Sequence, residues 1–338
     1  VSLHFQMIPV PFRDKTSAPS CGIIAGMDVH DHPDQRGQWT TERVIVGRLI
    51  GLQGRLSRPF WGVMGIWATL CGALATNRVQ WNGEDLLLLA LVLLLADLAW
   101  GSFWDIVVGT DWSQLLAGSW SSAQPATLPA LPYTQPASPG GRLLHGLNRL
   151  VGWWRGAFWP AAGPAVLGSL AAVVLAGVLS LLLPDRVRLL NAVLVVLLAF
   201  GVVQRLRGQI PLAGEAFVQV ALGWLAGYMV FAEPRWEPVA LALCFAVAAW
   251  GLLRLGEARQ RAVWLLDGGQ ALSAVLLVAV NQPLAAGTVG LLLFGQIILQ
   301  PLLQHQPSLG PGAETRRVMQ RTWPWLMAAM LVAALSIP

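Results

Sequence analysis

Long apolar runs alternate with short polar connections over most of this chain, and many of the runs reach the length of a membrane span. A helix that crosses the hydrocarbon core of a bilayer needs roughly 20 mostly apolar residues. Backbone polar groups in lipid must be satisfied internally, so such runs are expected to be helices. The pattern predicts an all-α, polytopic membrane bundle of about nine transmembrane helices. Their expected ranges are about 59–76, 85–104, 157–183, 187–203, 214–232, 238–255, 262–280, 284–303 and 322–337.

The composition agrees with an integral membrane protein. Of the 338 residues, 55% are hydrophobic and only 12% are charged, and the mean hydropathy is +0.59. A soluble domain carries about 25% charged residues. An isoelectric point near 9.8 is also found in nucleic-acid-binding proteins, but here the arginines are scattered singly between apolar segments. We therefore expect the lipid bilayer as the main partner, and no nucleic acid.

Basic residues fall unevenly on the connections between the predicted spans. When successive connections are assigned to alternating sides, eighteen arginine and lysine residues lie on one side and four on the other. Cytoplasmic connections of membrane proteins carry the excess of basic residues. The distribution predicts a cytoplasmic N-terminus and an odd number of spans. The expected location is a bacterial inner (cytoplasmic) membrane.

The chain divides into a polar segment and a membrane domain. Residues 1–58 are expected to be partly disordered, and Met27 is an alternative start to Val1. Residues 59–338 form the transmembrane domain, which includes a long cytoplasmic connection at 105–156. The end of that connection reads RLLHGLNRLVGWWRGAFW, with arginines alternating with leucine and tryptophan at helical spacing. This pattern is typical of a helix in the headgroup layer, and we interpret most of the 17 tryptophans as interfacial anchors.

Three carboxylates follow one another at the end of the second predicted span. Asp97 lies inside the apolar run, Asp105 at its edge and Asp111 just beyond. Asp97 and Asp105 are two helical turns apart and are expected on one helix face. Carboxylates gathered at a membrane boundary are suitable ligands for Mg²⁺, which binds one or two of them together with phosphate oxygens. The alternative is that Asp97 pairs with a polar group inside the bundle and that the other two only end the helix.

Two further stretches combine charge with predicted cytoplasmic boundaries. Arg205 and Arg207 end the fourth span, and a guanidinium binds phosphate through its planar fork. The alternative is that these arginines only set the topology. Arginines also follow the sixth span, where acidic residues lie among them as potential ligands or as partners in weak surface ion pairs. The residues of interest in that stretch are Arg254, Glu257, Arg261 and Asp267.

The segment LRGQIPLAGE, followed by GWLAGY, lies within residues 205–234. Together with nine spans and a cytoplasmic N-terminus, it resembles the UbiA superfamily of intramembrane prenyltransferases. The resemblance implies transfer of a polyprenyl group from its diphosphate to an acceptor, with Mg²⁺ held by two aspartate-rich motifs. In the register of the first motif this chain has Gly101, Asp105 and Gly109, so only the middle aspartate matches. In the register of the second it has Gln260 and Trp264.

These departures leave three readings of the resemblance open. The chain has the fold without the chemistry, or it has rebuilt the metal site, or arginines hold an anionic ligand without metal. The rebuilt site would use Asp97, Asp105, Asp111, Glu257 and Asp267. The arginine site would use Arg205, Arg207, Arg254 and Arg261. The first hypothesis is a diverged prenyltransferase, or a silent relative that binds an isoprenoid diphosphate or another amphiphile. The alternative is a non-enzymatic transporter, or a structural subunit with partner membrane subunits.

Overall fold

The computed structural model describes residues 62–80, 82–110, 112, 138–255, 259–304 and 311–337. Within these ranges the regular structure is entirely helical. Six helices are long and apolar enough to cross a membrane: 83–109, 162–182, 185–206, 212–231, 236–254 and 260–279. Two shorter apolar helices cover 63–74 and 283–299. The prediction of an all-helical, membrane-type protein is confirmed, whereas the count of nine spans and the side of the N-terminus stay predictions.

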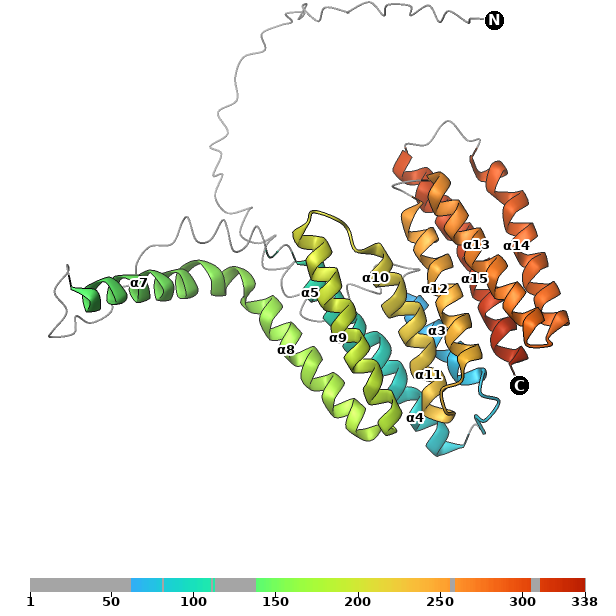
Figure 1. Ribbon diagram of the computed structural model, residues 1–338, viewed down its shortest axis with the longest axis horizontal. Coiled ribbons are helices and arrows are strands. Elements are labelled where there is room, and N and C mark those ends of the chain that lie inside the picture. The colour runs from blue at the N-terminus through green and yellow to red at the C-terminus, as the bar shows by residue number, and fades with distance from the viewer. Residues whose placement is uncertain are drawn as a thin grey trace, which may run out of the picture. The chain divides into compact units, whose positions relative to one another are not determined.

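Each predicted span overlaps a helix or a continuous series of helical segments (Figure 1). Segments labelled η are π-helical and continue directly into their α-helical neighbours. The elements are α3 (Gly62–Leu74), α4 (Gly83–Leu93), η1 (Leu94–Gly101), α5 (Ser102–Gly109), α7 (Pro139–Trp153), η2 (Trp154–Phe158), α8 (Trp159–Leu182), α9 (Asp185–Leu206), α10 (Leu212–Ala216), η3 (Phe217–Leu222), α11 (Gly223–Phe231), α12 (Trp236–Arg254), α13 (Arg259–Ala279), α14 (Pro283–Gln304) and α15 (Pro311–Ser336). The segment 1–58 and most of the connection at 105–156 lie outside the described residues.

Local sequence signals explain where several helices begin. The Asn82 side chain accepts a hydrogen bond of 2.7 Å from the Asp85 backbone N–H, and so caps the first turn of α4. Between α13 and α14 the chain reverses at Asn281, whose φ of 61° is the left-handed conformation that asparagine tolerates. Pro283 then opens α14, because proline at a first helical position loses no hydrogen bond.

Close backbone contacts through glycine hold the centre of the bundle together. A Cβ added to Gly227 of α11 would lie 2.9 Å from the Ala73 backbone nitrogen of α3, and still closer to the Thr69 carbonyl oxygen. A Cβ added to Gly269 of α13 would lie 2.6 Å from the Ala248 nitrogen of α12. Small residues allow this approach in membrane helices, where van der Waals packing drives association. The pairs α3–α11 and α12–α13 are therefore fixed at the backbone level.

Tryptophans in the middle of the helices belong to this core and not to an interface. Trp100 and Trp224 are completely buried, and Trp104 is 3% exposed. Trp224 stacks on Phe245 with ring centroids 5.7 Å apart. These three are therefore not among the interfacial anchors, because their indoles fill space between helices. The interfacial interpretation fits Trp154 and Trp159, which are exposed in and beside η2.

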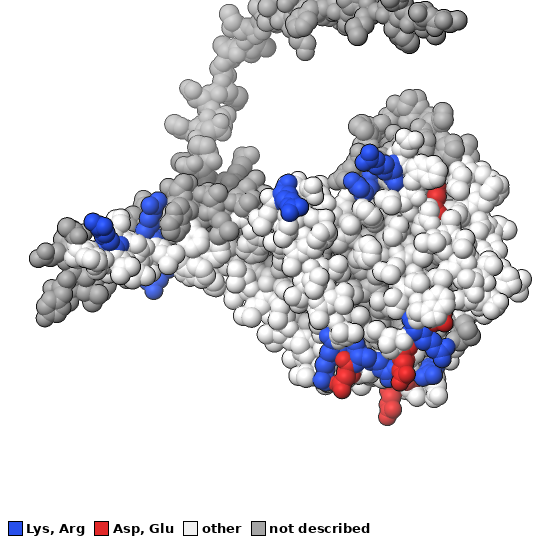
Figure 2. All heavy atoms as spheres, in the orientation of Figure 1, with Lys and Arg blue, Asp and Glu red and all other residues white. Residues whose placement is uncertain are grey.

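Charged side chains gather at the two ends of the bundle and leave its middle nearly free of them (Figure 2). The helices α9 and α12 both begin at one end, at Asp185 and Trp236, and finish at the other, near Arg205 and Arg254. We define the arginine-rich end by α5, the finishes of α9 and α12 and the start of α13, which carry Asp105, Arg205, Arg207, Arg254 and Arg261. Arg321 of α15 lies beside Gln296 and Leu299 in the second half of α14, which runs back toward this end. We define the mixed end by the starts of α4, α9 and α12 and the residues just before them, which carry Arg78, Glu84, Asp85, Asp185, Arg186, Arg188, Glu233, Arg235 and Glu237.

Candidate functional site

Asp105 and Arg205, the two central residues of the sequence-based hypothesis, lie at the same end of the bundle. Asp105 is exposed on α5, which packs against α9, and Arg205 is in the last turn of α9. Trp104 lies between these helices: a Cβ added to Gly201 of α9 would lie 2.9 Å from the tip of its ring, and Gly214 of α10 also touches it. The geometry therefore permits one ligand to reach both helix ends.

The arginines at this end differ in their surroundings. The Arg205 Nε is buried and has no hydrogen-bond partner within the described part of the chain, whereas Arg207 is exposed. The Arg254 guanidinium lies 5.6 Å from the centre of the Trp250 ring, a cation–π distance. Arg261 is exposed at the start of α13. Arg205 is the residue whose buried donor would gain most from an anionic ligand.

Asp97 lies deeper, where two π-helical segments meet. The segments η1 and η3 pack against each other and against α3. A Cβ added to Gly65 of α3 would lie 3.9 Å from Asp97 Oδ1 and 3.8 Å from the Gln219 carbonyl oxygen. Gln219 Nε2 in turn donates to Glu215 Oε1 at 3.5 Å. Asp97 and Glu215, each engaged in further interactions, thus belong to one polar junction inside the bundle. Wide π turns are often found at functional sites, which makes this junction of interest.

Asp267 faces a neighbouring helix inside the bundle. Gln296 Nε2 of α14 donates to Asp267 Oδ1 at 3.1 Å, and Gln296 Oε1 accepts from Gln270 Nε2 at 2.9 Å. Gln270 is completely buried and Gln296 is 2% exposed. These side chains form a polar network between α13 and α14.

The predicted magnesium ligands are only partly described. Asp111 and Glu257 lie outside the described residues. Among the residues that the structure does describe, no group of three or more histidine, cysteine, aspartate or glutamate side chains is found at metal-binding spacing. Mg²⁺ binds one or two carboxylates together with phosphate oxygens, so this finding does not test the predicted site. The five-residue metal site stays a prediction.

A third polar cluster, which the sequence-based hypotheses missed, joins η1 to α8 and α9. Trp100 Nε1 donates to Asn191 Oδ1 at 2.8 Å, and Asn191 Nδ2 donates to Ser180 Oγ at 2.7 Å. Arg188 Nε donates to the Ser180 carbonyl oxygen at 3.2 Å. Asn191 is a lone amide inside an apolar run, and a polar residue in a span usually faces a polar partner. This signal could have predicted the cluster from the sequence. The same signal marks Gln270 and Gln296.

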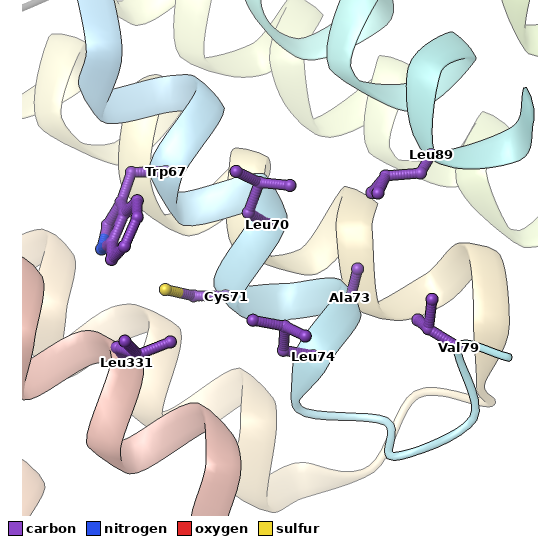
Figure 3. A pocket seen from close by; sticks show the side chains of 8 residues that line it. All are labelled: Trp67, Leu70, Cys71, Ala73, Leu74, Val79, Leu89 and Leu331. Atoms are coloured by element: carbon purple, nitrogen blue, oxygen red, sulfur yellow. The ribbon is translucent and has the colours of Figure 1, made fainter. Parts of the chain in front are cut away.

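An apolar cavity of about 150 Å³ lies near the mixed end, between α3, α4 and α15 (Figure 3). The side chains around it carry no charge, and Cys71 contributes the sulfur atom seen in the figure. Such a cavity accommodates a hydrocarbon group but offers no chemistry. Its lining residues are Trp67, Leu70, Cys71, Ala73, Leu74, Val79, Leu89 and Leu331.

Comparison with protein-family models, with curated proteins and with solved structures finds no match to this chain.

Proposed function

We propose that this protein binds the phosphate end of an isoprenoid diphosphate or a similar amphiphile at its arginine-rich end, as a diverged or silent relative of the UbiA prenyltransferases. One observation carries the proposal: the helix packing brings Asp105, Arg205 and Arg254 to the same end of an apolar bundle. The proposal includes a cytoplasmic position for this end, because it holds most of the arginines.

The chemistry of the site follows from the arginines. Guanidinium groups bind phosphate oxygens in a planar, bidentate manner, and the buried Arg205 Nε supplies a donor that has no partner among the described residues. The outward faces of α8 and α9 expose leucine and valine, beside which a hydrocarbon tail stays in lipid. The proposal rests on the arginines and requires no magnesium ion.

Prenyl transfer at such a site would break the bond between the allylic carbon and the diphosphate oxygen. The diphosphate would leave with the bonding electron pair, and its charge would be stabilised by Arg205, Arg207, Arg254 and Arg261. An electron-rich acceptor carbon would then form the new bond to the allylic carbon and release a proton to water. A silent relative would bind the same diphosphate without this step.

Binding and transfer of a labelled isoprenoid diphosphate to the purified full-length protein test the proposal. We expect Arg205→Gln to weaken binding about tenfold, since one charge-assisted hydrogen bond is worth roughly that factor. Arg235→Gln, at the mixed end, is the matched control and is expected to bind normally. Equal binding by the unaltered protein and both variants would contradict the proposal. An absence of binding by all of them would contradict it as well. Product formation with a supplied acceptor separates an enzyme from a silent relative.

Orientation is tested independently by labelling introduced cysteines in sealed membrane vesicles. Arg207→Cys and Glu233→Cys replace exposed residues at the two ends of the bundle. We expect a membrane-impermeant reagent added from the cytoplasmic side to label position 207 and to leave position 233 unmodified. The opposite result would place the proposed site outside the cell, and labelling of both positions from one side would contradict the span assignment.

The wide apolar faces of α8 and α9 favour a second candidate, a structural subunit of a membrane complex. Their membrane-length windows are only 17% and 28% buried within the chain, which leaves room for a neighbouring subunit. Extraction in mild detergent followed by crosslinking distinguishes the two candidates. Stoichiometric recovery of a partner protein, together with no affinity for isoprenoid diphosphates, would favour the subunit.

A further inference from the structure

A small recess lies between α14 and α15, and none of its lining residues belongs to the site of the proposed function. Its volume is about 40 Å³, and it is lined by Gln296, Leu299, Arg321, Thr322 and Trp325. Gln296 and Thr322 are each 2% exposed, whereas Arg321 is exposed. The recess therefore joins an accessible guanidinium to two polar side chains that are buried in the bundle.

The polar floor of the recess is held in place by the α13–α14 network. Both ends of the Gln296 amide are engaged, by Asp267 at 3.1 Å and by Gln270 at 2.9 Å. The Gln270 Oε1 atom is buried and has no hydrogen-bond partner in the described part of the chain. A membrane bundle tolerates this concentration of buried polar groups only at a cost, because each unpaired group is desolvated. The arrangement is therefore more polar than helix packing alone requires.

Apolar walls flank the polar floor. A Cβ added to Gly295 would lie 3.1 Å from the Trp325 ring, so the absence of a side chain on α14 lets this indole pack against the helix. Leu299 continues the wall toward the end of α14 and is 37% exposed. A ligand here meets hydrocarbon walls, the exposed Arg321 guanidinium at the mouth and the buried Thr322 hydroxyl further in.

We propose that this recess binds the phosphate group of an anionic phospholipid from the leaflet at the arginine-rich end. Basic pockets between membrane helices are known to hold acidic headgroups. About 10–15 Å³ of such volume holds one water, so a recess of about 40 Å³ has room for a few phosphate oxygens while the rest of the headgroup stays at the mouth. Asp267 is not part of the lining, and the Gln296 amide separates its charge from the ligand.

The inference does not depend on the proposed function. It uses α14, α15 and Arg321, whereas the isoprenoid diphosphate site uses Arg205 and the ends of α5, α9 and α12. The two sites also differ in ligand, because the recess takes a phosphodiester of the bilayer itself. Loss of one binding activity therefore leaves the other measurable.

The test uses full-length protein, delipidated in neutral detergent and titrated with phosphatidylglycerol, phosphatidylcholine or inorganic phosphate. Bound ligand is counted by native mass spectrometry, and thermal stability is followed in parallel. We expect phosphatidylglycerol to bind Arg321→Gln about tenfold more weakly than the unaltered protein, because a charge-assisted hydrogen bond is lost. Arg235→Gln, which removes the same charge at the mixed end, is expected to bind as the unaltered protein does.

Thr322→Val keeps the charge and removes only a buried hydroxyl, and we expect it to weaken phosphatidylglycerol binding by about threefold.

Unchanged binding by Arg321→Gln would overturn the inference. Equal weakening by Arg321→Gln and Arg235→Gln would overturn it as well, since that result reports only total charge. Unchanged binding by Thr322→Val would exclude the recess as the location. Displacement of the lipid by equimolar inorganic phosphate would show a free-phosphate site and would reject the lipid as its ligand.

Discussion

Two pairs of helices in this bundle are held together in different ways. In the window from 212 to 231, which includes α11, 72% of the residues are buried, whereas in the window of α8 only 17% are. The α11 window packs through glycine against the backbone of α3, and α8 is joined to α9 and η1 by the chain from Trp100 through Asn191 to Ser180. Lipid tails are as apolar as leucine, so burial alone gives membrane helices little reason to associate. The helices are therefore held together in two ways: by close backbone contact at the centre of the bundle and by a few side-chain hydrogen bonds at its periphery.

The largest expected effect comes from closing the gap between α3 and α11. Gly227→Leu places a branched side chain where even a Cβ would meet the backbone of Thr69 and Ala73. Backbone atoms cannot move aside as side chains do, so we expect a loss of about 3 kcal/mol or more, enough to prevent recovery of folded protein. Gly177→Leu on α8 is the control, because a Cβ there meets nothing within 4 Å. Thermal unfolding in detergent, monitored by size-exclusion chromatography, measures both. Similar stability of the two variants would contradict the contrast between centre and periphery.

Trp104 joins the two regions, because α5 uses it to contact both α9 and α10. Trp104→Ala leaves a large void at a residue that is 3% exposed, and we expect it to cost roughly 3–5 kcal/mol. Trp264→Ala is the matched control, since that side chain is 74% exposed. The midpoint of chemical denaturation compares the two. An equal loss at Trp264 would mean that its face is covered by another protein.

Removal of the polar bonds between α8 and α9 is expected to have a moderate effect. Asn191→Ala leaves the buried Trp100 Nε1 without its acceptor and should cost about 1–2 kcal/mol. A double-mutant cycle with Ser180→Ala isolates the second hydrogen bond, for which we expect a coupling energy of about 0.6 kcal/mol. A coupling energy of zero would show that the polar chain does not hold α8 to α9.

The smallest effect is expected on the outward face of α9. Val196 is 68% exposed, and Val196→Ala should change stability by less than about 0.5 kcal/mol. The measurement is thermal unfolding of protein extracted from its native membrane, compared with protein purified alone. A large loss in the extracted sample only would show that this face contacts a partner, as the structural-subunit candidate requires.

Hydropathy predicted the helical segments well, because a bilayer allows few other backbone structures. The predicted spans 262–280 and 284–303 left only a short connection, and the chain reverses there at Asn281. The helix at Pro139–Trp153 was predicted from its alternation of arginine with leucine and tryptophan. In both cases a local rule of backbone or interfacial chemistry decides the structure. The prediction that Asp105 and Arg205 lie at the same end of the bundle came from assigning successive connections to alternating sides of the membrane.

The contacts between helices were not predictable from the pattern. Nothing in the run around Gly227 shows that its partner is Thr69, since any apolar helix with small residues satisfies the same rule. The π-helical segments of Asp97 and Gln219 add a residue to a turn, a change with no clear signature in composition. The general interpretation of tryptophan as an interfacial anchor did not single out Trp100 and Trp224, because their burial depends on helices distant in sequence. The sequence therefore grouped Asp105 and Arg205 at one end of the bundle, but it did not predict the contacts around them.

The helix α7 has a consequence for how the protein is handled. None of its residues is buried in the chain, and Leu143, Leu147 and Leu150 are exposed along its length. A helix of 15 residues is marginal in water without a surface to cover its apolar side. We therefore expect the segment to complete its folding on the membrane surface. A change of detergent or headgroup composition will alter the helical content of this one segment while the rest of the bundle keeps its structure.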